Sequence, residues 1–172
     1  TMSISDIGRE LGVKFIVDGT VQKQGDNIRV VPKLYRVKNE THMWSEVYDG
    51  YWEEIFEIQT EIAKELASNL HTALSPEEMN KIEQSGTQDP EAYEYYLKGN
   101  LLMQEITEMN IWKAIDKYKQ AIDLDENFAQ AYAGLGFAYF ELTIYDVPEP
   151  DLSLVPVAKK WAFKALELDE NL

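Results

Sequence analysis

The segment AIDKYKQAIDLDENF, residues 114–128, decides the fold because the chain repeats it as AKKWAFKALELDENL, residues 158–172. The two copies lie 44 residues apart and share two alanines and the run Leu-Asp-Glu-Asn. A weaker pair precedes them, AYEYYLKGNLL from Ala92 and AQAYAGLGFAY from Ala129. Repetition of this kind predicts an array of stacked helical units, each of which packs against its neighbours.

Small and aromatic residues recur in each copy at the spacing of two antiparallel helices. The small residues that we expect where helix backbones approach closely are Gly99 and Ala114 in one unit, and Gly136 and Ala158 in the next. Tyr118 and Trp161 are expected to fill the space beside them. The repeats therefore predict two helical hairpins.

This pattern resembles the tetratricopeptide repeat (TPR), whose first helix carries an aromatic residue and a glycine and whose second helix carries alanine, an aromatic residue and alanine. The first unit matches it with Tyr95, Gly99, Ala114, Tyr118 and Ala121. The second unit matches it with Tyr132, Leu135, Gly136, Tyr139, Ala158 and Ala165, although Ala162 stands at the second aromatic position. The resemblance implies an all-helical array.

The 44-residue spacing exceeds the usual TPR period of about 34 residues. The excess lies between Leu142 and Val157, where three prolines exclude a continuous helix, so we expect a long loop between the helices of the second repeat. The predicted domains are an α+β domain over residues 1–84 and two TPR repeats over residues 85–172, at about 90–126 and 127–172. Ser85 to Asp89 is the predicted linker.

The first 50 residues predict a short helix followed by three antiparallel strands. The helix begins at a Ser3 cap and ends at Gly12. Apolar and polar residues then alternate from Val13 to Gln22 and again from Ile28 to Leu34, on either side of a hairpin turn. The third predicted strand runs from His42 to Tyr48.

Two further features limit the fold of this region. Pro32 has no amide hydrogen, so its strand must lie at a sheet edge or be locally unpaired. After Tyr51 the pattern becomes that of a helix of about 20 residues, and another helix begins at Ser75 and Pro76. The apolar face of the longer helix comprises Ile55, Phe56, Ile62, Ala63, Leu66 and Leu70. A partial three-stranded sheet with helices, followed by a helical array, makes the fold class α+β.

Residues 3–84 also carry an ordered set of short motifs. They are Glu10-Leu11-Gly12, Gly19-x-Val21, Trp44, Tyr48-Asp49 and Ile55-Phe56-x-x-Gln59. This order resembles the second half of the TolB amino-terminal-like domain, which TPR repeats commonly follow in bacterial regulators, and in which a further strand and helix come first. The resemblance implies a regulatory, non-catalytic segment of an adenylate or guanylate cyclase, a protein kinase or a membrane-bound transcription regulator.

The net charge of −15 arises entirely after residue 50. Residues 1–50 contain seven acidic and seven basic side chains, whereas the remainder contains 24 acidic and 9 basic ones. Such a negative field repels phosphate backbones and anionic lipids, which argues against nucleic acid as a partner, and no apolar run is long enough to insert into a membrane. We interpret the acidic surface as a solvated helical face, with an acidic docking site as the alternative.

Residue types that carry out chemistry are sparse. The chain has no Cys, and His42 and His71 have no partners at metal-ligand spacing, so no metal site is predicted. The acidic side chains Glu53, Glu54, Glu57 and Glu61 lack the loop and carbonyl ligands of a calcium site. Because phosphate-binding glycine motifs and nucleophile elbows are also missing from the sequence, we predict no catalytic residue and no cofactor.

The concave face of the repeats is the predicted binding site. Aligning Gly99 with Gly136 turns eight side chains toward an inner groove: Tyr93, Tyr96, Asn100, Met103, Gln104, Phe137, Phe140 and Glu141. Aromatic and Met side chains bind an extended peptide or a partner helix by burying apolar area, and Asn and Gln can bond to its backbone. In the alternative, Phe137 and Phe140 pack against the next helix of the array as core.

Together these features predict a protein-interaction and regulatory module of a bacterial signalling protein, with a nucleotide cyclase as the leading candidate. The expected partner is a protein or peptide, and the expected location is the cytoplasm. The alternative is an extracytoplasmic, periplasmic sensor region of a membrane-bound transcription regulator. A sheet without its first strand and an array that stops at Leu172 expose apolar faces, so self-association is also expected.

Overall fold

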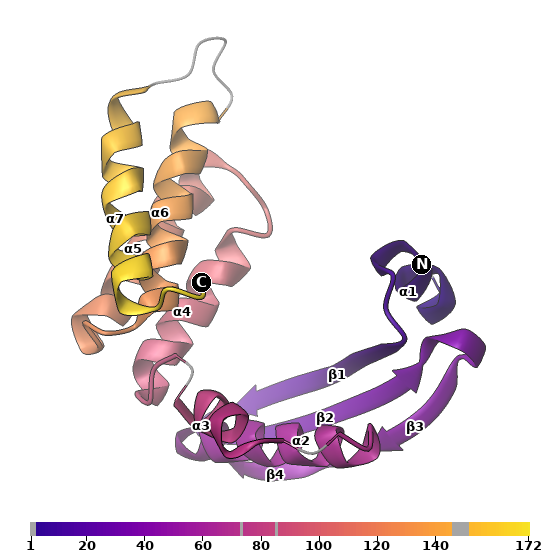
Figure 1. Ribbon diagram of the computed structural model, residues 1–172. Helices are drawn as coiled ribbons and strands as arrows, with labels where there is room; N and C mark the ends of the chain where they lie inside the picture. The colour runs from indigo at the N-terminus through magenta and orange to yellow at the C-terminus, as the bar shows by residue number, and fades with distance from the viewer. Residues whose placement is uncertain (1–2, 73, 85, 146–151) are drawn as a thin grey trace. The chain divides into compact units, whose positions relative to one another are not determined.

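The computed structural model describes residues 3–72, 74–84, 86–145 and 152–172, and the chain divides into two compact units, Thr1–Glu83 and Gln84–Leu172. The first unit contains a small antiparallel sheet with helices, and the second is helical (Figure 1). This combination confirms the predicted α+β class. Within the described ranges, every helix is too short or too polar to span a bilayer.

The first unit opens with a helix that is capped at both ends. α1, Ile4–Leu11, begins where the Ser3 hydroxyl accepts a hydrogen bond from the Asp6 amide. It ends at Gly12, whose φ of 66° lies in the left-handed region that favours glycine. Both ends agree with the prediction.

The sheet is built on a central strand that is paired on both sides. β1, Phe15–Gln24, and β2, Asn27–Arg36, form a hairpin in continuous antiparallel register. On its other side β2 pairs with β3, Thr41–Ser45, and with β4, Tyr48–Tyr51. The 3₁₀ turn Val37–Asn39 leads from β2 into β3. The sheet thus has four strands: β3 corresponds to the predicted third strand, which ends earlier than expected, and β4 was not predicted, since it shares only Tyr48 with that strand.

Pro32 explains why the pairing along β2 is interrupted between β3 and β4. The facing ends of β3 and β4 keep the same register along β2, so they behave as one strand with a gap. The gap lies opposite Val31 and Pro32. Proline donates no hydrogen bond to a neighbouring strand, and the ladder is interrupted there. Of the two predicted alternatives, a sheet edge or a local loss of pairing, the structure has the second, and only on the side of β3 and β4.

Helix α2, Ile55–Asn69, lies along one face of the sheet (Figure 1). It follows a 3₁₀ turn at Trp52–Glu54 and has 15 residues, so it is shorter than predicted. Its Ile55 and Ile58 are buried, and the rest of the buried core of this unit comprises Ile28, Val30, Leu34, Val37 and Trp52. Helix α3, Pro76–Gln84, starts at the predicted cap, where the Glu78 amide donates to the Ser75 hydroxyl.

The edge strand β1 carries large apolar side chains that stay exposed. Phe15, Val17 and Val21 point to the same side as Leu34 and Val30 of β2, because the residues paired across an antiparallel ladder share a face. The two β2 side chains are buried, whereas Phe15, Val17 and Val21 are 37%, 52% and 64% exposed. The apolar face of the sheet is therefore covered at β2 and open at β1.

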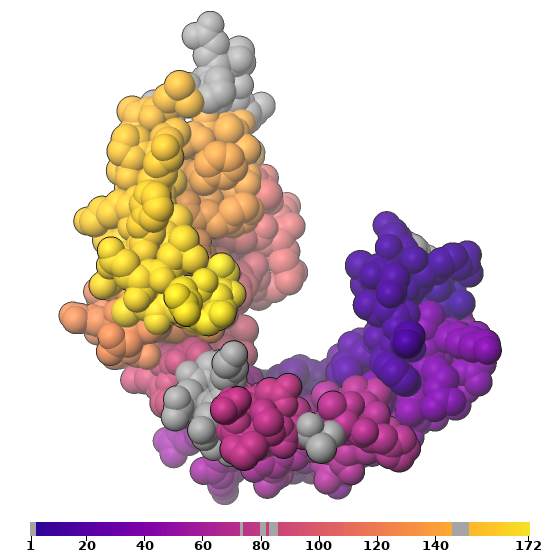
Figure 2. All heavy atoms as spheres, in the orientation of Figure 1, coloured from indigo at the N-terminus to yellow at the C-terminus, as the bar shows by residue number. Residues whose placement is uncertain are grey.

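The second unit consists of two antiparallel helix pairs. The first pair is α4, Pro90–Leu102, with α5, Glu108–Leu124, and the second is α6, Ala129–Ile144, with α7, Val155–Leu168. The side chains of α7 lie directly against those of α6 (Figure 2). Asp89 caps α4 as predicted, because its carboxylate accepts hydrogen bonds from two amides of the first turn.

The predicted loop between Leu142 and Val157 is shorter than expected. α6 continues to Ile144, a 3₁₀ turn occupies Leu152–Leu154, and α7 already begins at Val155. Pro156 lies in the first turn of α7, where the missing amide hydrogen breaks no helical hydrogen bond. Residues 146–151 of this loop, and Ser85 of the predicted linker, lie outside the described residues.

Candidate functional site

Tyr118 of α5 fills the junction of three helices. A Cβ atom added to Gly99 of α4 would lie 2.5 Å from its ring, and one added to Gly134 of α6 would lie 2.7 Å from it. Tyr118 itself is only 2% exposed. A glycine is thus needed at position 99 because the Tyr118 ring occupies the space of a side chain. This corrects the expectation that Gly99 is there to let two helix backbones approach. That expectation does hold for Gly136, which faces backbone atoms of α7.

The hydroxyl of Tyr118 orients a side chain of the predicted groove. It donates a hydrogen bond to Oδ1 of Asn100 over 2.9 Å. Burial, with a smaller contribution from Tyr96, raises the pKa of Tyr118 to about 12, so the hydroxyl stays protonated at neutral pH. Because the Asn100 carbonyl oxygen is engaged, its amide nitrogen is left to donate to a ligand.

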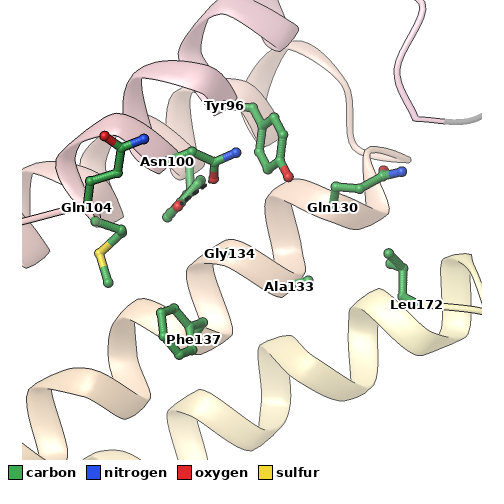
Figure 3. Close-up of a pocket in the computed structure, with 10 residues that line it drawn as sticks. Tyr96, Asn100, Gln104, Gln130, Ala133, Gly134, Phe137 and Leu172 are labelled. Carbon is green, nitrogen blue, oxygen red and sulfur yellow. Dashed lines mark hydrogen bonds between the residues drawn. The ribbon is translucent and has the colours of Figure 1, made fainter. Parts of the chain in front are cut away.

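A hollow of about 430 Å³ opens beside this hydrogen bond. Figure 3 shows side chains of α4 facing those of α6 across it, with Leu172 following α7. Its lining comprises Tyr96 and Asn100 of α4, Met103 and Gln104 directly after α4, Tyr118 of α5, Gln130, Ala133, Gly134 and Phe137 of α6, and Leu172. An apolar wall with a few amide groups is the composition of a site that holds an extended chain.

A second hollow of about 430 Å³ continues the first between α6 and α7. The two share Ala133, Phe137 and Leu172, so they form one surface, here called the groove. The second hollow adds Phe140 and Leu166, a floor of small residues and one basic side chain, Lys159. The groove therefore extends over α4, α6 and α7.

Phe137 and Phe140 belong to the groove and are not buried by α7. They are 50% and 47% exposed although α7 packs beside α6. The aromatic side chains that do pack between these two helices are Tyr132 and Trp161, whose stacked rings have centroids 5.8 Å apart. The next described helix of the array thus leaves both phenylalanines available to a ligand.

The structure brings six of the eight predicted groove residues together. Tyr96, Asn100, Met103, Gln104, Phe137 and Phe140 line the groove. Tyr93 stacks on Tyr96, with centroids 6.3 Å apart, and it lies outside the lining, as does Glu141. Sequence reasoning missed Gln130 and Leu172, which reach the groove only because the start of α6 and the end of α7 meet there.

The titratable side chains offer no metal centre in the described part of the chain. No three His, Cys, Asp or Glu residues are placed there to hold an ion. His42 lies in β3 and packs edge-on against Tyr35, with ring centroids 5.4 Å apart. It is therefore a structural side chain of the sheet.

Comparison with protein families identifies the helical pattern. Residues 110–142 match the family model of the TPR repeat. This TPR repeat includes most of α5 and α6 and therefore contains Tyr118, Gln130 and Phe137 of the groove. The phenylalanines and the orienting tyrosine thus lie within the part of the chain that is similar to a known repeat.

A curated relative adds a second similarity. The protein named "Putative adenylate cyclase 3" from Rhizobium meliloti (strain 1021) is 27% identical to this chain over 135 residues. The match covers 78% of this chain and 23% of the relative, so the matched segment spans less than a quarter of the length of that protein. The chain thus has one stretch that matches the TPR model and is similar to one segment of a protein named as a putative adenylate cyclase.

Proposed function

We propose that the helical unit binds an extended peptide segment of a partner protein in the groove. The main support for this proposal is that Phe137 and Phe140 are about half exposed and lie in the same groove as amide side chains. Exposed aromatic rings bury apolar area on binding, and amides such as Asn100 and Gln130 bond to an extended backbone. The TPR match over residues 110–142 supports a role in protein interaction.

The lining of the groove indicates which peptides it prefers. Of the described residues that line it, only Lys159 is charged. Asn100 presents a donor, because its oxygen accepts from Tyr118. The preferred ligand is therefore an apolar segment with an unpaired backbone carbonyl near Asn100 and few charges of its own.

Peptide selection tests this proposal. Short random peptides displayed on phage and selected on the full chain should yield apolar sequences, and Phe137→Ala should weaken their binding about tenfold. Phe163→Ala is the matched control, because Phe163 of α7 is 63% exposed and lines neither hollow. Equal losses in the two folded variants, or no loss in Phe137→Ala, would place the binding site elsewhere.

We further infer that the chain is a non-catalytic, regulatory part of a cytoplasmic bacterial signalling protein related to nucleotide cyclases. The similarity to the cyclase-type relative supports this inference. The resemblance of residues 3–84 to the TolB amino-terminal-like domain is consistent with it, since the motif residues have structural roles. Gly12 ends α1, Ile55 is buried, and Asp49 accepts a hydrogen bond from Arg29 over 2.6 Å.

The coding sequence on both sides of the chain tests this inference. A cyclase or kinase catalytic domain would support regulation of that activity in the cytoplasm. A DNA-binding domain joined to a membrane span would instead indicate an extracytoplasmic sensor. The 172-residue chain alone should form no cyclic nucleotide from ATP or GTP, and detectable turnover would contradict a non-catalytic role.

We also propose that the chain by itself self-associates through the open face of β1. Phe15, Val17 and Val21 are exposed there, and the outer edge of β1 pairs with no strand among the described residues. An unpaired apolar edge is a template for another strand.

A further inference from the structure

The hairpin of α4 and α5 has a further hollow, distinct from the two that form the groove and on the opposite side of the hairpin. It has a volume of about 690 Å³ and is lined by Lys98, Leu101 and Leu102 of α4 and by Trp112, Lys113, Asp116 and Lys117 of α5. Lys98 and Leu102 each lie two residues from the groove residue Asn100, which is roughly 200° around α4. This surface, here called the basic hollow, is therefore separate from the groove.

Two large apolar side chains of the basic hollow face solvent. Leu101 is 65% exposed and Trp112 is 49% exposed. Trp112 also contacts Tyr139 edge-on, with ring centroids 6.5 Å apart, so its orientation is supported by the fold. A tryptophan already held in place loses little freedom on binding, and tryptophan is enriched in the residues that dominate interfaces.

Lysines surround this apolar patch although the chain is strongly acidic. Lys98, Lys113 and Lys117 are three of only nine basic residues after residue 50, where there are 24 acidic ones. Lys98 and Lys117 lie over the ring of Tyr95, at 5.2 Å and 5.4 Å from its centroid. One aromatic ring thus draws two ammonium groups together at the rim of the hollow.

The ion pairs within the basic hollow leave room for an incoming carboxylate. Lys98 pairs with Glu94, and Lys117 pairs with Asp116. Both pairs involve partly exposed side chains, and such surface pairs are readily exchanged. Lys113 makes no ion pair among the described residues, and Asp116 is the one acidic residue of the lining. The lining therefore carries a net positive charge.

We propose that the basic hollow binds an acidic amphipathic helix of a partner protein. Lys113 and Lys117 are four residues apart on α5, so they lie one above the other on the same face. A partner helix with two carboxylates one turn apart matches this spacing, and a large apolar side chain between them enters beside Trp112. The rest of the helical unit repels such a helix, because it is acidic.

Fluorescence anisotropy with synthetic helical peptides tests the proposal on the full chain. The probe is a labelled alanine-based helix with two Glu residues four positions apart and one Phe between them. Two matched peptides have Gln in place of both Glu residues, or Ala in place of Phe. The probe should bind about tenfold more tightly than either matched peptide, and high salt should weaken its binding.

Variants locate the site of binding. Trp112→Ala and Lys113→Glu should each weaken probe binding about tenfold, whereas Lys113→Arg should preserve it. Lys113→Glu should in turn gain affinity for a peptide that has Lys in place of both Glu residues. Phe137→Ala should leave probe binding unchanged, since Phe137 lies in the groove.

Several results would overturn the proposal. The first is that the probe does not bind, and the second is that the Gln peptide binds equally well. The third is that folded Phe137→Ala loses probe binding while Trp112→Ala keeps it. Competition between the probe and dimerisation of the chain would assign the hollow to a second copy, and it would equally overturn the proposal of a partner helix. Circular dichroism of each variant confirms that the four helices are intact.

Discussion

Tyr118 shows how a single side chain shapes both the core and the groove. Its ring fills the space that Gly99 and Gly134 leave open, and its hydroxyl orients Asn100. The equivalent position in the second helix pair is Ala162. Because alanine is small, α7 approaches Gly136 directly, and a Cβ atom on Gly136 would lie 3.0 Å from the Ala162 amide nitrogen.

Removing the Tyr118 hydroxyl should destabilise the chain modestly. Tyr118→Phe keeps the ring that packs against the glycines, and it deletes the hydrogen bond to Asn100. We expect a loss of about 1 kcal/mol in the free energy of unfolding, measured by urea denaturation at pH 7. Asn100→Ala should give a similar loss, and the double variant should lose less than the sum. Strict additivity would show that the two side chains do not interact.

The raised pKa of Tyr118 predicts a loss of stability at alkaline pH. Burial raises this pKa from 10.0 to about 12 in the folded chain, so the folded state holds the proton more tightly than the unfolded state. The resulting stabilisation is complete below about pH 10 and is lost as the pH rises toward about 12. Urea unfolding across this range should show a smaller decline for Tyr118→Phe than for the wild type, and an equal decline would contradict the prediction.

At the scale of elements, each unit is organised by one segment that has neighbours on both sides. β2 pairs with β1 on one side and with β3 and β4 on the other. α6 packs against α5 and α7 and supplies residues to both hollows of the groove. A change that shifts α6 should therefore affect both the stability of this unit and the shape of the groove.

Gly136→Val should force α6 and α7 apart. An added Cβ atom would lie 3.0 Å and 3.2 Å from backbone atoms of Ala162 and Ala158, which cannot rotate away as a side chain can. Overpacking of this kind costs about 1–3 kcal/mol. The matched control is Ala133→Val in the same helix, because Ala133 borders the open groove. Urea denaturation should show a clearly larger loss for Gly136→Val, and equal losses would contradict tight packing at this glycine.

At the scale of the whole molecule, each compact unit has a central element that is covered on both sides, while the edge strand of the first unit leaves apolar side chains exposed. In the second unit α6 is packed on both sides. In the first unit β2 is buried, while Phe15, Val17 and Val21 of β1 are exposed. The balanced charge of residues 1–50 does not oppose contact between copies there, whereas the acidic remainder does.

Self-association through β1 can be tested at the level of strand register. If two copies of β1 pair antiparallel about Gly19, Val17 lies opposite Val21 of the second copy, and Asp18 lies opposite Thr20, so no like charges face each other. The chain has no Cys, so Val17→Cys and Val21→Cys introduce unique thiols. A mixture of the two variants should form a disulfide-linked dimer on oxidation, because position 17 of one copy lies opposite position 21 of the other. Each variant alone should form little disulfide-linked dimer. A purely monomeric chain by light scattering at tens of micromolar would contradict self-association.

Local patterns in the sequence determined the α+β class, the helix pairs and most helix ends. The caps at Ser3, Ser75 and Asp89 and the stop at Gly12 depend on hydrogen bonds and backbone angles within a few residues. Apolar periodicity likewise depends only on neighbouring positions along one element. The first part of the predicted proline-rich loop was wrong because Thr143 and Ile144 extend α6, and its end was wrong because proline is tolerated at the start of a helix.

Only the tertiary structure decided which distant side chains meet. Tyr118 lies between glycines of two other helices, Leu172 joins Phe137 at the groove, and Pro32 interrupts the pairing of a strand that begins after a turn. These contacts depend on how whole helices and strands pack, which is set by side-chain volumes on several elements at once. Six of the groove residues could be named from the repeat alone, but Gln130 and Leu172, and the exposure of the whole set, follow from that packing.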